Sequence, residues 1–231
     1  MTKPLAATIA TLLLSIRILH ANASPTVCID PGHPSEVSSG AVVGRLSENH
    51  LDWVIANRVR DILTEDGVNV VLTKNREMQL VTNRKRAEIA NAAHAVLFIR
   101  LHCDVGAGRG FTWYFPDHSG TKDGVTGPPA FICVQSRALA ETMNRTMAPL
   151  LAGKLSSNPV KTDAATKVGA SQGGVLTGSI FARVPTALIE MCFLNQTRDA
   201  RFIDSEPGQS AMAAAIAVGI MAYLKQLDVP G

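Results

Sequence analysis

The sequence predicts an α/β fold: a single domain in three layers, with a central, mostly parallel twisted sheet flanked by helices on both faces. Apolar segments of strand length alternate along the chain with segments whose apolar residues recur at helical spacing. The predicted strands are almost continuously apolar, which is typical of parallel strands buried on both faces. The chain has 231 residues, 46% of them hydrophobic, which is enough for one domain with a complete core.

The first predicted strand covers residues 26–29, and the first helix covers 48–66. This helix carries an apolar stripe at helical spacing, with Ser47 as a plausible N-cap and Gly67 as a stop signal. The segment 116–129 is rich in glycine and proline and is predicted to be a loop. The remaining predicted elements are strands over 68–73, 95–101, 110–115 and 186–191, and helices over 84–93, 136–151 and from 210 onward.

Residues 1–23 are predicted to be a signal peptide, which leaves residues 24–231 as the single mature domain. Lys3 supplies the positive charge, residues 5–16 are apolar, and Ala21-Asn22-Ala23 fits a cleavage site. About 12 apolar residues cannot span a bilayer, which needs about 20. We therefore expect an exported protein, periplasmic or extracellular, with no membrane span in the mature chain.

The net charge and the positions of the cysteines indicate which binding partners and which disulfide bonds to expect. The formal charge is +3 and no run of five like charges occurs, so no nucleic-acid partner is expected. Each of the four cysteines lies inside an apolar run, where buried free thiols are common, although an exported protein could pair them. We expect the cysteines to be free and buried. We also expect the protein to be a monomer.

Four polar residues lie where the predicted sheet should form a site. His33 follows the first strand in "VCIDPGHP", and His102 ends the strand "AVLFIRLHCD". Glu190 lies in the apolar strand "TALIEMCFLN", and Glu48 begins the first long helix. Sites in open α/β sheets form at the carboxyl ends of the strands, so these four side chains are expected to lie close together.

Each of these residues also has a structural interpretation. A single histidine at a strand end commonly makes ordinary hydrogen bonds, and Glu48 could complement the helix dipole. Glu190 is harder to explain in this way, because a carboxylate among apolar neighbours is costly unless it is paired or metal-bound. Two histidines and one carboxylate form a known catalytic zinc set, and a second carboxylate that takes a proton from water would complete an amide hydrolase.

Five segments in order carry a resemblance to a known family. They are "IDPGHP", "SENHLDWVIANRVRDIL", "LFIRLHCD", "GRGFTWYF" and "PTALIEMCFLN". Together they resemble the zinc-dependent N-acetylmuramoyl-L-alanine amidases of bacterial cell-wall turnover, over roughly residues 25–226. Members of that family hydrolyse the amide that joins N-acetylmuramic acid to the L-alanine of the peptidoglycan stem peptide.

The resemblance implies a role for each of the four polar residues. His33, Glu48 and His102 would hold one Zn²⁺ ion, and Glu190 would be the general base. The "DPGH" turn would then end its strand in order to aim the imidazole of His33 at the metal.

Further residues receive weaker interpretations. Asp30 is expected either to shape the turn or to support His33, and Arg86, in a helix that matches the family pattern R-x-x-x-A-N, is interpreted as structural. Arg45, Gln172 and Arg183 are candidates for substrate contact, although a solvated surface position is also expected for each.

The sequence departs from the family pattern near these positions. Cys103-Asp104 stands where Ala-Asn is usual, Cys192 stands where Gly is usual, and Asp52 stands where Asn is common. The two cysteines are interpreted as core residues, with a bond between them or an effect on the metal as alternatives. None of these departures removes a predicted ligand.

The short segment after residue 115 argues against an inhibitory insertion. Cell-division members of the family carry a long insertion that blocks zinc, whereas only about twenty residues precede the next predicted helix here. We therefore expect a site that needs no activator protein. The alternatives are a zinc amidase or peptidase on the same scaffold that acts on free muropeptides or another amide, and a non-catalytic wall-binding module.

Overall fold

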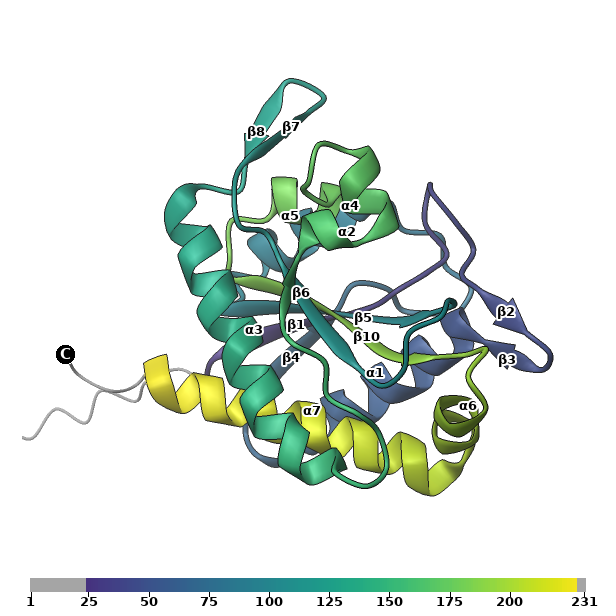
Figure 1. Ribbon diagram of the computed structural model, residues 1–231. Coiled ribbons are helices and arrows are strands. Elements are labelled where there is room, and N and C mark those ends of the chain that lie inside the picture. Colours follow the sequence, from purple (N-terminus) through teal and green to yellow (C-terminus); the bar gives the residue numbers. More distant parts are fainter. Residues whose placement is uncertain (1–23, 228–231) are drawn as a thin grey trace, which may run out of the picture.

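The computed structural model describes residues 24–227, so the predicted signal peptide at 1–23 lies outside the described residues. A six-stranded sheet in the order β4-β1-β5-β10-β6-β9 forms the centre of the domain (Figure 1). Every neighbouring pair in it is parallel except β6 with β10, which confirms the predicted mostly parallel sheet. The strands are β1 (Thr26–Pro31), β4 (Asn69–Leu72), β5 (Leu97–Asp104), β6 (Thr112–Phe115), β9 (Lys161–Thr162) and β10 (Thr186–Phe193).

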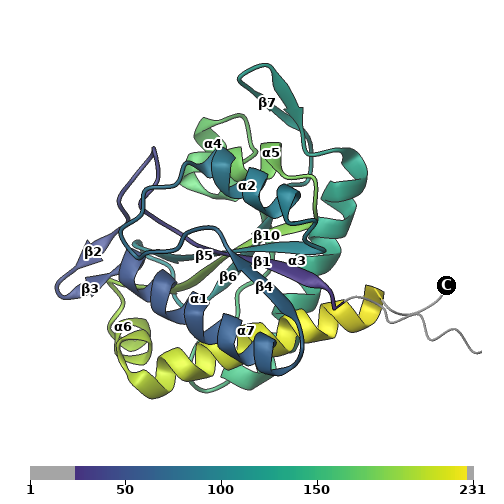
Figure 2. The same cartoon turned by 180° about the vertical axis from the view of Figure 1, so that it is seen from behind.

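Helices cover both faces of this sheet, as predicted (Figures 1 and 2). On one face α1 (Glu48–Glu65) and α3 (Ala130–Leu151) both pack on α7 (Glu206–Leu227), and the three helices enclose the larger core. On the other face α2 (Asn83–Ala92) and α5 (Thr177–Phe181) enclose a smaller core around Phe98. The shorter helices are η1 (Asp163–Ala165) and α4 (Lys167–Ser171), which contact each other, and α6 (Thr197–Asp204), which packs on α7.

Helix α1 shows how closely local sequence sets an element. Leu51, Ile55 and Val59 recur at every fourth position and are buried, as the periodicity predicts. The helix ends one residue before the predicted boundary, and Gly67 follows with a φ of +80°, which glycine adopts without strain. Ser47 occupies the N-cap position, but its side chain makes no capping hydrogen bond.

The segment 116–129, predicted to be a loop, contains a hairpin that its glycine- and proline-rich composition did not predict. Strands β7 (Gly120–Lys122) and β8 (Val125–Gly127) form a two-stranded hairpin. Asp123 and Gly124 connect them with φ values of +51° and +73°, and Asp-Gly is a strong signal for such a two-residue turn. Helix α3 also begins at residue 130 and not at the predicted 136. A second hairpin, β2 (Val42–Val43) with β3 (Leu46–Ser47), leads into α1.

The C-terminal helix α7 is longer than predicted, since it begins at residue 206. By length and composition alone it is apolar enough to cross a membrane, and it is the one such helix among residues 24–227. However, it packs along α1 and α3, and Met212, Ile216 and Ile220 are fully buried there. These contacts identify α7 as a core helix of this domain.

Candidate metal centre

The first predicted ligand, His33, stands on a tight turn that leaves β1. Gly32 fixes the path of this turn, because its N–H donates to the carbonyl of Leu101 at 3.0 Å. A Cβ atom at Gly32 would lie 2.6 Å from His102 Cε1 and 2.7 Å from Asp52 Oδ2, so only glycine fits between these side chains. His33 itself has a φ of +44°, a left-handed conformation that is unfavourable for a residue with a Cβ.

The other two predicted ligands approach from β5 and α1. His102 is the sixth residue of β5, and Glu48 is the first residue of α1. The backbone orients the carboxylate of Glu48, because its Oε2 accepts the N–H of Ala41 at 2.7 Å and its Oε1 accepts the N–H of Cys103 at 3.2 Å. Glu48 is buried, so its carboxylate is held in one orientation.

Three donor atoms from these side chains form a small triangle. His33 Nε2 lies 3.0 Å from Glu48 Oε1, His102 Nδ1 lies 3.1 Å from the same oxygen, and the two nitrogens are 3.2 Å apart. Two ligands bound to a tetrahedral zinc at its usual bond lengths are about 3.3 Å apart. The donor types and their spacing therefore fit a single zinc ion.

Hydrogen bonds around the triangle favour metal-binding tautomers. His33 Nδ1 lies 3.1 Å from the carbonyl of Ser38 and can donate to it, which leaves the lone pair of Nε2 facing the triangle. In His102 the nitrogen that faces the triangle is Nδ1, whereas Nε2 is buried without a hydrogen-bond partner among the described residues. The Asp52 carboxylate and the His102 ring both border Gly32. Asp52 is also buried, and neither of its oxygens has a hydrogen-bond partner among the described residues.

Burial and neighbouring groups keep His102 neutral and Glu48 charged. Burial lowers the pKa of His102 to about 4, so the ring is uncharged near neutral pH, as a metal ligand must be. Burial alone would raise the pKa of Glu48, but the adjoining rings of His102 and His33 outweigh it and hold that pKa well below its usual range. Burial also raises the pKa of Asp52, and repulsion from Glu48 adds to this effect.

Glu190, the predicted general base, lies on β10 directly beside His102. The two residues are paired in register across β5 and β10. Oε2 of Glu190 is buried and has no hydrogen-bond partner within residues 24–227. Burial raises the pKa of Glu190, and repulsion from Glu48 raises it further. Glu190 and the three predicted ligands line one cavity of about 510 Å³.

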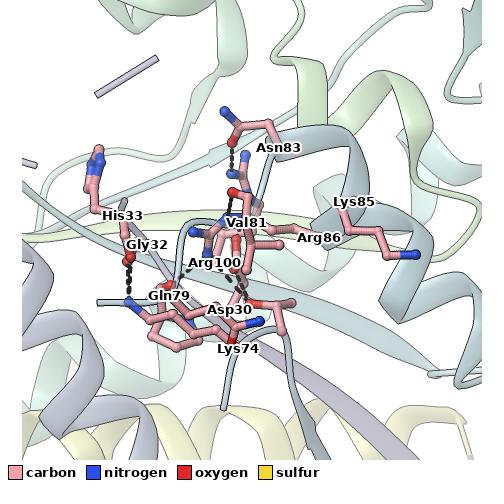
Figure 3. Close-up of polar contacts among 12 residues, drawn as sticks. Asp30, Gly32, His33, Lys74, Gln79, Val81, Asn83, Lys85, Arg86 and Arg100 are labelled. Atoms are coloured by element: carbon pink, nitrogen blue, oxygen red, sulfur yellow. Dashed lines mark hydrogen bonds and ion pairs between the residues drawn. The ribbon is translucent and has the colours of Figure 1, made fainter. Parts of the chain in front are cut away.

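A buried network around Asp30 supports the turn (Figure 3). Asp30 is fully buried; its Oδ1 accepts hydrogen bonds from Thr73 and Arg86, and its Oδ2 accepts one from Arg100 Nε at 3.0 Å. Burial alone would raise the pKa of Asp30, but the two guanidinium groups hold it well below its usual value. Asp30 makes no hydrogen bond to the imidazole of His33, so it shapes the turn and does not orient that ring directly.

Two buried cations bind all four successive carbonyls of the turn at residues 31–34. Arg86 donates to the first and the last of them, at 2.7 and 2.9 Å. Lys74 donates to the two between, those of Gly32 and His33 (Figure 3). It also donates to the side chain of Asn49 and to the carbonyl of Glu77. Burial and the neighbouring Arg86 lower the pKa of Lys74 to about 8.

The sequence identified Arg86 as structural, which these contacts confirm, but it missed Lys74. The signal available was weak: a lysine directly after a predicted strand, at a position where most lysines are solvated. Among the residues considered for substrate contact, Gln172 lines the cavity, whereas Arg45 pairs with Asp204 at the surface and Arg183 is exposed.

The cysteines are free and buried, as expected. Cys103 and Cys192 face each other in the larger core with their sulfur atoms 3.8 Å apart. They therefore contact each other beside the site, while the backbone of Cys103 supports Glu48.

Comparison with known proteins agrees with this geometry. The sequence profile of a family described as N-acetylmuramoyl-L-alanine amidase matches residues 27–222. The Bacillus subtilis protein YqiI is 29% identical over 204 residues, covering 87% of this chain and 85% of that protein. A germination-specific N-acetylmuramoyl-L-alanine amidase of the same organism is 26% identical over 217 residues, covering 88% of this chain and 81% of that protein.

A solved structure extends the similarity to three dimensions. The N-acetylmuramoyl-L-alanine amidase AmiC2 of Nostoc punctiforme superposes with a TM-score of 0.69 at 26% identity, covering 87% of this chain and 97% of that one. The profile match spans most of the chain and includes all four predicted site residues. This chain therefore belongs to the N-acetylmuramoyl-L-alanine amidase family of cell-wall enzymes.

Proposed function

We propose that the protein hydrolyses the amide bond between N-acetylmuramic acid and L-alanine in peptidoglycan, with one Zn²⁺ held by His33, Glu48 and His102. The observation that carries this proposal is the triangle of three donor atoms, 3.0–3.2 Å apart, in the same cavity as Glu190. The donor set leaves a fourth position for water or substrate, as catalytic zinc sites require.

The chemistry divides between the ion and the protein. When bound, zinc would polarise the amide carbonyl and lower the pKa of a water molecule. Glu190 lies beside His102, its Oε2 has no hydrogen-bond partner among the described residues, and it accepts a proton from the attacking water. The same carboxyl group then returns the proton to the amide nitrogen, which leaves as the amino terminus of the stem peptide. Glu48 and the two histidines keep their protonation states throughout.

The setting of this reaction follows from its substrate. Peptidoglycan lies outside the cytoplasmic membrane, and the predicted signal peptide at residues 1–23 would deliver the protein there. We propose a periplasmic or extracellular monomer that works without an activator protein. The segment between β6 and α3, at residues 116–129, is occupied by the hairpin β7–β8 and supports this proposal.

Mass spectrometry of purified peptidoglycan, incubated with the zinc-loaded mature protein alone, tests the proposal. The expected products are stem peptides with a free L-alanine amino terminus, and they should disappear with a chelator and with Glu190→Gln. The Glu190→Gln protein should still contain one zinc ion. Uncleaved peptidoglycan with zinc bound would reject this substrate or the independence from an activator, whereas a protein without zinc affinity would reject the ligands.

A further inference from the structure

The cavity contains a guanidinium group with unused hydrogen-bond donors. Arg100 lies on β5 two residues before His102 and is only 3% exposed. Its Nε donates to Asp30, and its Nη2 donates to Asn83 Oδ1 at 2.6 Å. Within residues 24–227 the hydrogen bonds of Arg100 use Nε and Nη2 and not Nη1, and Arg100 lines the cavity together with Glu190.

Arg100 shares the carboxylate of Asp30 with a second guanidinium group. Asp30 is the one carboxylate that pairs with it within the described part of the chain, and Asp30 also pairs with Arg86. Two guanidinium groups thus share one carboxylate. Asp163, which accepts the N–H of Leu176, and Glu190 both interact electrostatically with Arg100, but neither forms an ion pair with it among the described residues. An anionic group at this place on the cavity wall would complete the ion pairing of Arg100.

The guanidinium is also held in place before any ligand arrives. Asn83, which accepts the Nη2 hydrogen bond, is itself fixed, because its backbone N–H and its side-chain amide donate to Glu36 at 2.8 and 3.2 Å. Figure 3 shows Asn83 standing over the end of Arg100, on the same side of the turn as the His33 imidazole. Gly178 leaves the space for Nη1, because a Cβ there would lie 2.7 Å from it.

We propose that Arg100, aimed by Asn83, binds a carboxylate group of the substrate. This inference rests on the proposed function and adds to it the stem-peptide chemistry that the site prefers. A guanidinium with free N–H groups matches a carboxylate better than it matches a neutral amide.

The position of Arg100 indicates which carboxylate it binds. Along β5 the Cα atoms of Arg100 and His102 are about 6.6 Å apart, from the rise of about 3.3 Å per residue. Two extended residues of a stem peptide span about 7 Å. The matching group is the α-carboxylate of the second stem residue, which is free in D-glutamate and neutral in D-isoglutamine. Arg100 therefore makes the site selective for stem peptides that are not amidated at this position.

Isothermal titration of the zinc-loaded protein with two product peptides tests this selectivity. The peptides are L-alanyl-γ-D-glutamyl-L-lysine and its α-amide, L-alanyl-D-isoglutaminyl-L-lysine, which differ in one group. Charge-assisted hydrogen bonds predict about 10- to 100-fold tighter binding of the acid. In Arg100→Gln the acid should lose this advantage, while the amide binds within about twofold of the wild-type affinity.

Two further variants keep the result interpretable. Arg100→Lys retains a cation for Asp30 but removes the spare planar donors, so the preference should fall even where Arg100→Gln does not fold. Arg60→Gln changes the net charge equally at a partly exposed position on α1 and should keep the wild-type preference. Zinc content and circular dichroism, recorded for every variant, show whether the site and the fold are intact.

Three results would overturn the carboxylate site: equal affinity of the wild-type protein for both peptides, binding of neither, or a folded Arg100→Gln that keeps the preference. Cleavage of intact peptidoglycan decides the proposed function separately. Cleavage without a preference for the acid would reject only the role of Arg100. A preference in binding without any cleavage would reject only the proposed reaction.

Discussion

Replacing Lys74 by methionine should weaken zinc binding, although Lys74 does not contact the donor atom of any predicted ligand. Its ammonium group holds the carbonyls of Gly32 and His33 and so fixes the turn that carries the first predicted ligand. His33 has a positive φ, which costs roughly 1–2 kcal/mol for a residue with a Cβ and must be balanced by such contacts.

The size of the effect follows from the contacts that are lost. Methionine has a similar length but no donor, so the carbonyls of Gly32 and His33 would both lose Lys74 as a donor. Each unpaired buried carbonyl costs about 1–3 kcal/mol, so folding stability should fall by about 2–6 kcal/mol. Residues that orient a metal ligand typically contribute 10- to 100-fold to metal affinity, and we expect a loss of about this size here.

Competition with a chromophoric chelator gives the zinc dissociation constant for each protein. Lys85→Met is the matched control, because Lys85 is exposed on α2 and, among the described residues, forms its ion pair with Glu88 alone. Lys74→Arg should restore most of the affinity, since it returns a cation with several donors to the same place. A folded Lys74→Met protein that binds zinc as tightly as Lys85→Met would refute the role assigned to Lys74.

Three other substitutions test the site and its supports. Glu48→Gln should lower zinc affinity more than about 100-fold, measured with the same chelator, because a neutral amide replaces the charged ligand; near-normal affinity would remove Glu48 from the ligand set. Asp30→Asn should destabilise the fold by about 3–5 kcal/mol in urea, because Arg86 and Arg100 lose their shared carboxylate. The pKa of Asp30 is lower in the folded than in the unfolded state, so its contribution is complete above about pH 4 and is lost on further acidification. The wild-type minus Asp30→Asn difference in unfolding free energy should therefore shrink below that pH, and a constant difference would contradict the ion-pair explanation. Asp52→Asn should behave oppositely: the folded-state pKa of Asp52 is raised, so the wild-type protein loses stability as pH rises above about 4. The metal-free Asp52→Asn variant should gain about 1–3 kcal/mol at neutral pH and nothing at pH 4, visible as a higher Tm; equal Tm values at both pH values would mean that Asp52 has an unseen partner.

The elements with long hydrophobic patterns were predicted correctly from the sequence. Alternating apolar strands and amphipathic helices predicted the layered α/β domain, and the stripe on α1 placed that helix to within one residue. The short elements failed for the opposite reason. Hairpin β7–β8 offers only three residues per strand, so composition rich in glycine and proline outweighed the Asp123-Gly124 turn signal.

The four predicted site residues could be proposed from the sequence because each stands at a strand end or a helix start. The structure brings His33, Glu48 and His102 within one triangle and places Glu190 beside them, while their roles in zinc binding and catalysis stay predictions. Their donor spacing and tautomers depend on contacts with Ser38 and with the backbone of Cys103, which no sequence pattern specifies.

The residues that support the candidate ligands could not be identified from the sequence. The sequence analysis assigned no role to Lys74, directly after a predicted strand, or to Arg100, inside one, yet both are buried and bind groups of the turn. Their surroundings come from segments far apart in the chain, such as Asp30 with Arg100, and hydrogen bonds between such segments exist only after folding. The fold class and the chemical types of the candidate site residues could be predicted from the sequence, because they depend on local periodicity and residue identity. Tertiary structure decided the charge balance and the orientation of each group, because burial and partners across the sheet set both.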